Sequence, residues 1–285
     1  MNNSQNIFLC SFASPDLTRS VKRFKNQARE MNIYENIKVF GFNELTESKK
    51  KQIKNFKNKK KNRLFGYGCW KPEIISNYLK EIPKNAILQY SDIGCHLNYN
   101  GLERLKDYVY LTQKKSILGF QYKEPDFKKN NYKFQIYYER EYSKGDLFKY
   151  FDLELNNEVA QTEQFMSGVI FFKNDETSNF FLKKWNMACN EDYLIDDENS
   201  KMKNHKDFIE HRHDQSVFSI LCKLNHVSSI SASEIEWAED NYDKTWKHLD
   251  KFPILARRDK KYNLIKRFIN RQKRNIRRFL NKWVI

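Results

Sequence analysis

Residues 86–96, AILQYSDIGCH, join a short apolar run to a polar, turn-prone tip. The run at 86–90 is bounded by Pro83 before it and Gly94 after it, and its length is that of a buried strand. Asp92 then falls at the carboxyl end of this strand, where ligands of open α/β sheets bind. A carboxylate there can hold a divalent cation on a diphosphate. Asp92 can equally cap a turn in which Gly94 supplies a positive φ.

The flanking sequence repeats the pattern of strand and helix. Apolar runs at 7–12 and 37–42 predict strands, and 17–31 between them has the apolar spacing of a helix, which together predict the opening of a parallel α/β sheet. Further strands are expected at 116–120 and 165–173, with a short strand pair at 227–235. Helices are expected after Pro72, at 98–111, at 178–187 and from His213 or Asp214 to 221.

Charge and cysteine content limit the class of protein. The 285 residues carry a net charge of +16, but residues 257–285 hold 12 Lys or Arg against one acid, so most of the surplus lies in the tail. A globular body that grips nucleic acid is therefore disfavoured. Five widely spaced cysteines suit a reducing compartment. Without a signal peptide pattern or a run of about 20 apolar residues, we expect a cytoplasmic location or attachment to the inner face of a membrane.

Two segments of the chain are rich in basic residues. From residue 260 onward, apolar residues recur at helical spacing between basic ones, which predicts a basic amphipathic helix over 259–285 after a domain at 1–258. Such a helix is typical of a segment in an anionic membrane surface. Packing on the body, a protein partner and nucleic acid are the alternatives. The lysine-rich stretch at 43–64 predicts a solvated face, or a segment near an anionic substrate.

Three further polar positions accompany Asp92. Lys71 stands beside Trp70 at the start of an expected helix, where it either points a cation towards Asp92 or only packs the loop. Ser167 and Gly168 enter a strong strand and would let a ligand approach the backbone. The cluster HRHDQ at 211–215 opens an expected helix, so its side chains either face the ligand side of the sheet or are exposed loop residues and a simple N-cap.

The series FGYGCWKPEIISNYL, ILQYSDIGCHLN, KGDLFKYF, FMSGVIFFKN and HRHDQSVFSILC resembles bacterial nucleotide-sugar glycosyltransferases of capsule and lipooligosaccharide gene clusters. The similarity covers roughly residues 7–258. The order of the motifs also resembles glycosyltransferase family eight and its relatives. This resemblance implies an α/β fold of the GT-A type, a Rossmann-like mixed sheet flanked by helices.

The resemblance also implies roles for individual residues. Asp92 matches the first acid of the Asp-x-Asp motif that holds a metal on the donor diphosphate. Asp214 and Gln215 match an acidic-plus-amide pair near the anomeric carbon, the catalytic positions. The remaining donor-binding positions are Lys71 at the donor, Ser167 and Gly168 along the donor sugar, and the first strand's end from Ser11 to Ala13 at the nucleoside.

This chain departs from the motif at Gly94, where the second metal-binding Asp would stand. One carboxylate is a poor site for a hard divalent ion. Either His96, Asp214, His226 or His248 completes a Mn²⁺ or Mg²⁺ site, with His96 the favoured ligand, or cations such as Lys71 replace the metal.

The function expected from the resemblance is transfer of a sugar, favoured as UDP-linked and with retention, to a growing capsule or lipooligosaccharide glycan. The expected partners are the nucleotide-sugar donor, a glycan or lipid-linked glycan acceptor and an anionic membrane surface, without nucleic acid. The alternatives are a nucleic-acid-binding protein and a catalytically inactive GT-A module in a polysaccharide assembly.

Overall fold

The computed structural model describes residues 6–57, 64–127 and 131–257, together with residue 272. The expected basic helix at 259–285 lies outside the described residues apart from Gln272, and so does its membrane contact. The boundary at residue 258 therefore stays a prediction.

A six-stranded sheet forms the centre of the fold, with the order β2-β1-β3-β6-β5-β7. The first three strands are parallel to one another, β6 runs antiparallel to both β3 and β5, and β7 is parallel to β5. The parallel opening predicted from the first strand, helix and strand is confirmed by the pairing of β1 with β2, and the whole sheet is mixed, as the resemblance implied. The strands are β1 Ile7–Phe12, β2 Tyr34–Phe40, β3 Ile87–Ser91, β5 Ile117–Gln121, β6 Phe165–Lys173 and β7 Ser228–Ser231.

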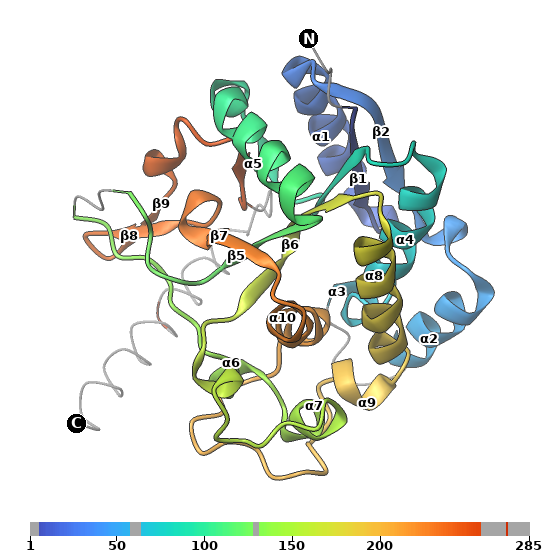
Figure 1. Cartoon of the computed structure of the whole chain (residues 1–285), viewed down its shortest axis with the longest axis vertical. Helices are drawn as coiled ribbons and strands as arrows, with labels where there is room; N and C mark the ends of the chain where they lie inside the picture. Colours follow the sequence, from blue (N-terminus) through green and yellow to red (C-terminus); the bar gives the residue numbers. More distant parts are fainter. Residues whose placement is uncertain (1–5, 58–63, 128–130, 258–271, 273–285) are drawn as a thin grey trace.

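Helices cover both faces of the sheet (Figure 1). The apolar sides of α1 (Thr18–Met31) and α5 (Leu102–Lys115) pack on one face. Those of α4 (Lys71–Glu81), α8 (Glu176–Cys189) and α10 (Asp214–Leu224) pack on the other. The expected α/β fold, a mixed sheet flanked by helices, is confirmed.

Shorter elements complete the described chain. The remaining helices are α2 Glu47–Lys57, α3 Leu64–Tyr67, α6 Glu139–Tyr142, α7 Gly145–Tyr150 and α9 Asp192–Ile195. Two small antiparallel pairs join β4 His96–Leu97 to β10 Ile254–Leu255 and β8 Ala238–Asp240 to β9 Asp243–Thr245. Single 3-10 turns occur at Pro15–Leu17, Phe42–Glu44, Tyr99–Gly101, Val159–Gln161, Ala232–Glu234 and Lys247–Leu249.

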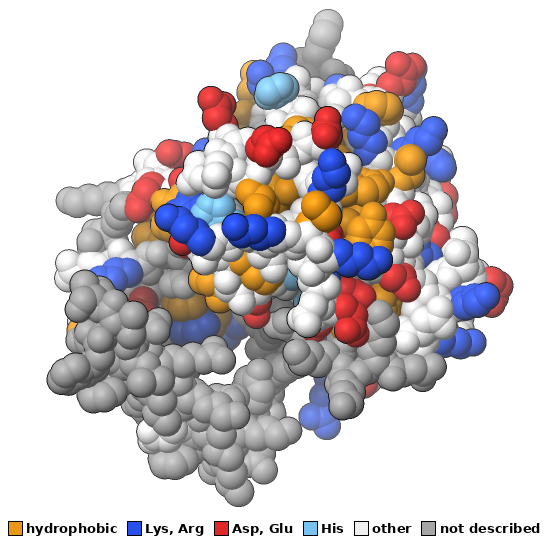
Figure 2. All heavy atoms as spheres, turned by 90° about the horizontal axis from the view of Figure 1, so that it is seen from below, with side chains coloured by type: hydrophobic (Ala, Val, Ile, Leu, Met, Phe, Trp, Pro, Cys, Tyr) orange, Lys and Arg blue, Asp and Glu red, His pale blue; other side chains and the backbone are white. Residues whose placement is uncertain are grey.

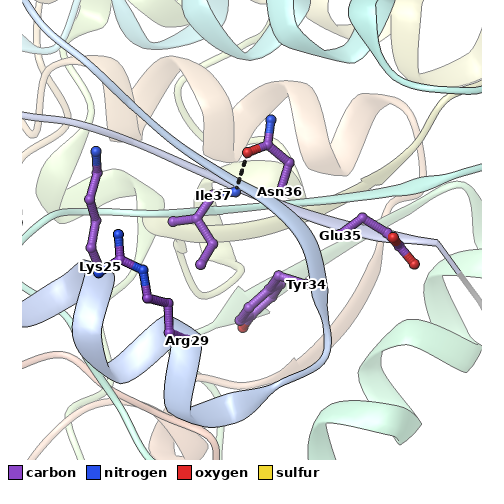
Figure 3. A pocket seen from close by; sticks show the side chains of 6 residues that line it. All are labelled: Lys25, Arg29, Tyr34, Glu35, Asn36 and Ile37. Atoms are coloured by element: carbon purple, nitrogen blue, oxygen red, sulfur yellow. Dashed lines mark hydrogen bonds between the residues drawn. The ribbon is translucent and has the colours of Figure 1, made fainter.

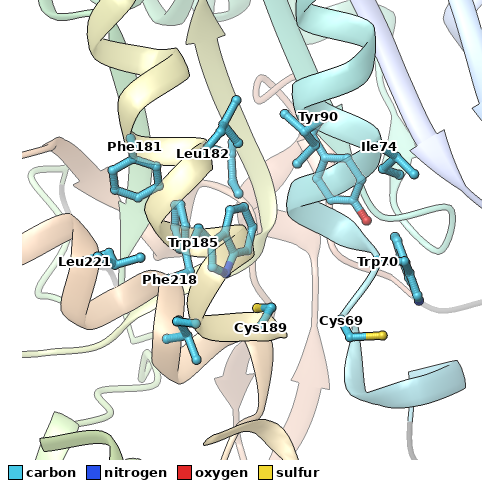
Figure 4. Close-up of a cluster of buried hydrophobic side chains, with 14 of the residues drawn as sticks. Cys69, Trp70, Ile74, Tyr90, Phe181, Leu182, Trp185, Cys189, Phe218 and Leu221 are labelled. Atoms are coloured by element: carbon cyan, nitrogen blue, oxygen red, sulfur yellow. The ribbon is translucent and has the colours of Figure 1, made fainter. Parts of the chain in front are cut away.

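The core between the sheet and the α4, α8 and α10 layer is aromatic (Figure 4). Trp185 of α8 packs on Phe218 of α10, with ring centroids 4.8 Å apart. Burying an aromatic side chain of this kind contributes about 2–3 kcal/mol. Tyr90 of β3 lies in the same core. The last residues of β3 and the first residues of α4 and α10 are thus fixed by a densely packed layer.

Two sequence expectations differ from the observed elements. Residues 227–235 hold one strand, β7, followed by a 3-10 turn, because β7 pairs with β5 rather than with its own neighbour. Helix α2 is not simply a solvated face: Ile53 and Phe56 are buried. Lys49 is also buried, because its ammonium group donates to Asn190 Oδ1 at 2.5 Å.

The face formed by α6, α7 and α9 carries exposed apolar side chains among charged ones (Figure 2). Tyr150, Tyr193, Met202 and Ile209 are among them. Within the described parts of the chain, no helix is both long and apolar enough to cross a membrane.

Candidate functional site

A left-handed turn precedes α4 and sets the position of its first residues. Phe65, Gly66, Tyr67 and Gly68 all have positive φ, at 53°, 87°, 56° and 75°. This conformation costs roughly 1–2 kcal/mol for each residue with a Cβ, so it is found where the surroundings enforce it. A Cβ on Gly68 would lie 2.5 Å from Asp214 Oδ1, which means that only glycine lets this backbone pass so close to the carboxylate.

Lys71, the first residue of α4, carries the central cation of the site. Its side chain is 5% exposed, and its Nζ lies 2.8 Å from Asp214 Oδ2 and 3.5 Å from Asp92 Oδ1. The ammonium group also donates to the backbone oxygen and the hydroxyl of Ser167, each at 3.1 Å. Lys71 therefore joins three segments that are far apart in the sequence. Of its two interpretations, the cation towards Asp92 is the one observed.

Asp92 lies at the carboxyl end of β3, as expected, and its side chain is 46% exposed. Tyr90 donates its hydroxyl to Asp92 Oδ1 at 2.6 Å. The Asp92 backbone amide donates to Gly168 O at 2.8 Å, and a Cβ on Gly168 would lie 3.2 Å from Asp92 Oδ2. The turn after Asp92 is held by Arg23 of α1, which donates to the carbonyl groups of Ile93 and Cys95. One carboxylate oxygen is thus engaged, while Gly168 leaves space beside the other.

Asp214 is the first residue of α10 and its side chain is 2% exposed. Ser167 donates its hydroxyl to Asp214 Oδ2 at 2.8 Å, and Trp185 Nε1 donates to the Asp214 carbonyl at 3.3 Å. The preceding His213 has φ 57° and ψ −128°, which turns the chain sharply into the helix. The side chain does not serve as the N-cap considered from the sequence; it is committed to Lys71 and Ser167.

Burial and charge act in opposite directions on this cluster. Burial raises the pKa of Asp214, and Lys71 partly offsets that rise. Burial alone would lower the pKa of Lys71, but Asp214 and then Asp92 outweigh it, so the pKa of Lys71 is raised. Burial, reinforced by the charge of Asp92, raises the pKa of the Tyr90 hydroxyl, which therefore stays a donor. One ammonium and two carboxylate groups leave the ionised cluster with a net charge of −1.

Gln215, the second residue of α10, belongs to a chain of buried hydrogen bonds that the sequence did not predict. Its Nε2 donates to Gln164 Oε1 at 2.8 Å, and Gln164 Nε2 donates to Glu139 Oε2 at 3.3 Å. Glu139 is fully buried and also accepts from Lys223 and from the hydroxyls of Ser143 and Ser219. Because a carboxylate only accepts, Glu139 fixes the orientation of the Gln164 amide and thereby that of Gln215. The Gln215 carbonyl oxygen is the atom this arrangement leaves available.

His211 and His213 are buried, at 4% and 3% exposure, so their interpretation as exposed loop residues is wrong. Their rings bond to the carbonyl oxygens of Leu194 and Ile195, the last two residues of α9, and Tyr67 packs on the ring of His213 at 4.7 Å. Burial lowers the pKa of His211 well below its ordinary value. These histidines fix the entry to α10 and leave the ligand side to Asp214 and Gln215.

A divalent metal would find one suitable protein ligand here. Within the described residues, no group of three or more His, Cys, Asp or Glu side chains is arranged to hold a metal ion. His96 Nδ1 faces Gln27 Nε2 at 3.4 Å, and His248 bonds to the carbonyl groups of Ser233 and Glu236. The half-exposed Asp92 can still share Mg²⁺ or Mn²⁺ with substrate phosphates, a common arrangement for these ions. Asp92 with the space beside Gly168 fits such a shared ion, whereas the ring of His96 faces the side chain of Gln27.

The expected nucleoside edge lies at the end of β1, next to β3. Ser11 is fully buried, and its hydroxyl has no hydrogen-bond partner within the described residues. It shares the sheet face of Leu9, on the α1 side, while Tyr90 faces the α4 side. Ala13 is almost buried and its amide donates to Phe40 O. Within the described residues, no hydrogen bond or ion pair joins Ser11 or Ala13 to Lys71, Asp92 or Asp214, and their nucleoside role stays a prediction.

Two surface pockets lie away from the cluster. One, of about 230 Å³, lies between α1 and β2 and is lined by Lys25, Arg29, Tyr34, Glu35, Asn36 and Ile37 (Figure 3). The other, of about 250 Å³, contains His96 with Gln27, Trp246 and Asp250 among its lining residues. Of the residues predicted to form the site, the structure thus brings together Lys71, Asp92, Ser167, Gly168 and Asp214, with Gln215 beside them. Gly68, Tyr90, Gln164 and Glu139 are additions that only the fold reveals.

No protein-family model matches the chain, and no curated protein sequence matches it. Among solved structures it is similar to a glycosyltransferase involved in the glycosylation of the major capsid of PBCV-1, with 10% identity over 92% of this chain and 96% of that chain and a TM-score of 0.49. Mouse xyloside xylosyltransferase 1 is similar at 12% identity, over 83% and 76% of the two chains, with a TM-score of 0.40. The galactosyltransferase LgtC follows at 11% identity, over 80% and 74%, with a TM-score of 0.40. At these identities and scores the likenesses bear on no residue role.

Proposed function

We propose that this protein is a GT-A type glycosyltransferase that uses a nucleotide-diphosphate sugar. The observation that carries the proposal is the convergence of Lys71, Asp92, Ser167 and Asp214 at the carboxyl end of β3. This edge is where α/β sheets bind nucleotides. A buried cation between two acids, next to a glycine that leaves the backbone accessible, suits a charged sugar donor better than an apolar ligand.

The net charge of the Lys71, Asp92 and Asp214 cluster indicates that a diphosphate needs additional positive charge to bind there. Lys71 is already balanced by two carboxylates, so a diphosphate would enter a site with net negative charge. We therefore propose that Asp92 holds a Mn²⁺ or Mg²⁺ ion shared with the donor phosphates, which supplies positive charge for the departing diphosphate. Lys71 orients both acids and contributes the permanent part of the positive charge.

The residues beyond Lys71 act on the sugar. In this proposal Asp214, which Lys71 and Ser167 hold in position, binds a donor sugar hydroxyl and orients the anomeric carbon. The side-chain carbonyl of Gln215, whose amide group is fixed by Gln164, stabilises in this proposal the positive charge that develops on the sugar. An amide oxygen that stabilises this charge without serving as a base is consistent with the retaining outcome favoured from the resemblance.

The finer parts of the proposal rest on the resemblance alone. They are a UDP-linked hexose donor, a bacterial capsule or lipooligosaccharide acceptor, and a cytoplasmic location at the inner membrane face through residues 259–285. Each is a separate question from the location of the donor site.

A thermal-shift screen across nucleotide sugars, with and without Mn²⁺, tests the proposal. A ligand that binds only the folded protein raises the melting temperature by mass action. We expect one nucleotide sugar to raise it, and the same compound to be slowly hydrolysed when no acceptor is present. Binding without hydrolysis or transfer would favour the inactive GT-A module. No shift with any nucleotide sugar would contradict a donor site altogether.

A further inference from the structure

Arg212 lies two residues before Asp214, and its guanidinium group is held by tyrosines instead of by an acid. The guanidinium carbon lies 3.8 Å from the ring centroids of both Tyr137 and Tyr142, and 5.8 Å from that of Tyr122. Among the described residues, no carboxylate forms an ion pair with it; its side chain hydrogen-bonds to the hydroxyl of Tyr137, and its backbone amide donates to Tyr142 O and Ser216 Oγ. The charge is thus fixed in place while its side-chain donors are not used by an acid.

The tyrosines form a rigid support for this cation. The rings of Tyr137 and Tyr142 are 5.0 Å apart at 75°, and those of Tyr122 and Tyr137 are 4.6 Å apart at 69°. Tyr122 and Tyr137 hydrogen-bond on to Glu236 and Gln135. Stacking on aromatic rings stabilises a guanidinium group through its face and leaves the N–H donors at its edge directed outward. Those donors have the planar fork that recognises carboxylate or phosphate oxygens in pairs.

Arg140 provides a comparison, because its guanidinium group is bound entirely by other residues of the protein. Arg140 of α6 also lies over a tyrosine, Tyr138, at 4.4 Å. Its guanidinium group, however, bonds to Asp207 Oδ2 at 3.2 Å and to Gln161 Oε1 at 2.9 Å. The guanidinium group of Arg140 is therefore bound by an acid and an amide, whereas that of Arg212 is held by tyrosine rings and the Tyr137 hydroxyl, without an acid. The difference points to a ligand for Arg212.

The position of Arg212 connects it to the sugar side of the candidate site. Gln164 links the two places: its amide nitrogen donates to Tyr137 O, its carbonyl accepts from Tyr122 N, and its side chain accepts from Gln215. In the proposed function the donor phosphates lie at Lys71 and Asp92 and the anomeric carbon lies near Gln215. Arg212 is thus connected, through Tyr122, Tyr137 and Gln164, to the sugar end of the donor and not to its phosphates, and the ligand that meets the sugar end is the acceptor.

We propose that Arg212, supported by Tyr122, Tyr137 and Tyr142, is an anion subsite that binds a carboxylate or phosphate group of the acceptor. The inference rests on the proposed function for the identity of the acceptor, while the anion site itself stands on the geometry of Arg212. An acceptor of this kind is an acidic sugar, or a sugar or lipid carrier that bears a phosphate.

The test measures binding of three small probes to the full chain by ligand-observed NMR titration: methyl β-glucuronide, glucose 6-phosphate and the neutral methyl β-glucoside. We expect the protein to bind at least one charged probe about tenfold or more tighter than the neutral one, as a charge-assisted pair would give. Arg212→Gln should remove this preference and Arg212→Lys should retain part of it. Arg140→Gln, the matched control, should keep it whole.

Each outcome has a defined meaning. A preference for the carboxylate probe assigns an acidic sugar, a preference for the phosphate probe assigns a phosphorylated acceptor, and equal binding of both supports a general oxyanion site. Equal binding of all three probes, or a preference that survives Arg212→Gln in a folded variant, would overturn the proposal. Because no donor is present, an anion preference in a protein that binds no nucleotide sugar would retain the Arg212 site and reject the glycosyltransferase function.

Discussion

Lys71 and Asp214 begin two different helices on the same side of the sheet, and their charged groups meet at 2.8 Å in a buried position. Ser167 of the intervening strand bonds to both. Removing one partner of a buried ion pair typically destabilises a protein by roughly 3–5 kcal/mol, because the other charge is left buried without compensation. The pair therefore contributes both to the fold and to the proposed chemistry, and experiments must separate the two.

Asp214→Asn keeps the size of the side chain and removes its charge. We expect turnover to fall by about 10²–10⁴-fold. Binding of UDP should be no weaker, because removing a negative charge does not disfavour an anionic diphosphate. Turnover by stopped assay and affinity by calorimetry are compared at a temperature where both proteins are folded. Unchanged turnover would remove Asp214 from the mechanism.

The pH profile carries a second signature of Asp214. Burial raises its pKa, so its ionised form is lost as pH falls through a value above the ordinary value of about 3.9. If the carboxylate is required, the acid limb of kcat should lie above that ordinary value. The limb should be absent from the residual activity of Asp214→Asn. An acid limb that persists unchanged in the variant would belong to another group.

Gly68→Ala should lower kcat more than Gly66→Ala does. A Cβ at Gly68 meets Asp214 Oδ1 at 2.5 Å, whereas a Cβ at Gly66 meets Ile53 Cγ1 at 2.8 Å, and both glycines have positive φ. Both alanine variants should therefore lose stability by about 1 kcal/mol or more. Only Gly68→Ala should also lower kcat by at least about tenfold, because it displaces the carboxylate. Equal kcat in the two variants would show that the contact with Asp214 has no role in turnover.

Gln164→Glu should make kcat depend on the protonation of the introduced carboxyl group. The introduced carboxyl group would face the buried carboxylate of Glu139, and such a like-charge neighbour raises its pKa. When protonated, it can donate to Glu139 and accept from Gln215, as the amide does. We expect near-normal kcat at acidic pH and a steep loss as pH rises, while Gln164→Leu should be impaired throughout.

The exposed Gln161 provides the control for this experiment. It bonds to Arg140 and takes no part in the chain from Glu139 to Gln215. Gln161→Glu should leave the pH profile unchanged. If Gln164→Glu also leaves it unchanged, the orientation of Gln215 does not depend on Gln164.

Donor binding should depend on a divalent ion through Asp92. With Lys71 balanced by two acids, we expect EDTA to weaken UDP affinity by at least about tenfold, and Mn²⁺ or Mg²⁺ to restore it. Asp92→Asn should already have the weaker affinity and should respond little to either treatment. If EDTA leaves the affinity of the wild-type protein unchanged, Lys71 and other cations suffice without metal.

The elements that follow from local pattern were the ones predicted well. The strands at 7–12 and 165–173 agree with β1 and β6, because apolar runs bounded by breakers specify them locally. The direction of β6 could not be predicted, since it is set by pairing with β3 and β5. Glycines at 66 and 68 indicated an irregular loop, but positive φ at Phe65 and Tyr67 is enforced only by the packed surroundings.

The candidate site likewise contains residues that could be proposed from the sequence and residues that could not. Asp92, Lys71 and Asp214 stood at strand or helix ends and could be proposed from the sequence together with the resemblance. Glu139 and Gln164 could not, because their role depends on partners more than 20 residues away in the chain. For His211 and His213 the sequence left exposed loop residues as one of two alternatives, and only their bonds to carbonyl groups of α9 explain why they are buried.

The most direct test of the donor site compares two buried lysines. Lys71 and Lys144 have side chains 5% and 4% exposed, and each pairs with a buried aspartate at 2.8 Å, Asp214 and Asp196 respectively. Both Lys→Met variants should therefore lose stability to a similar extent. Calorimetric titration with the nucleotide sugar found in the screen should give a dissociation constant at least about tenfold weaker for Lys71→Met. For Lys144→Met it should stay within about threefold of the wild-type value. A folded Lys71→Met that binds the donor as tightly as the wild-type protein would contradict the account.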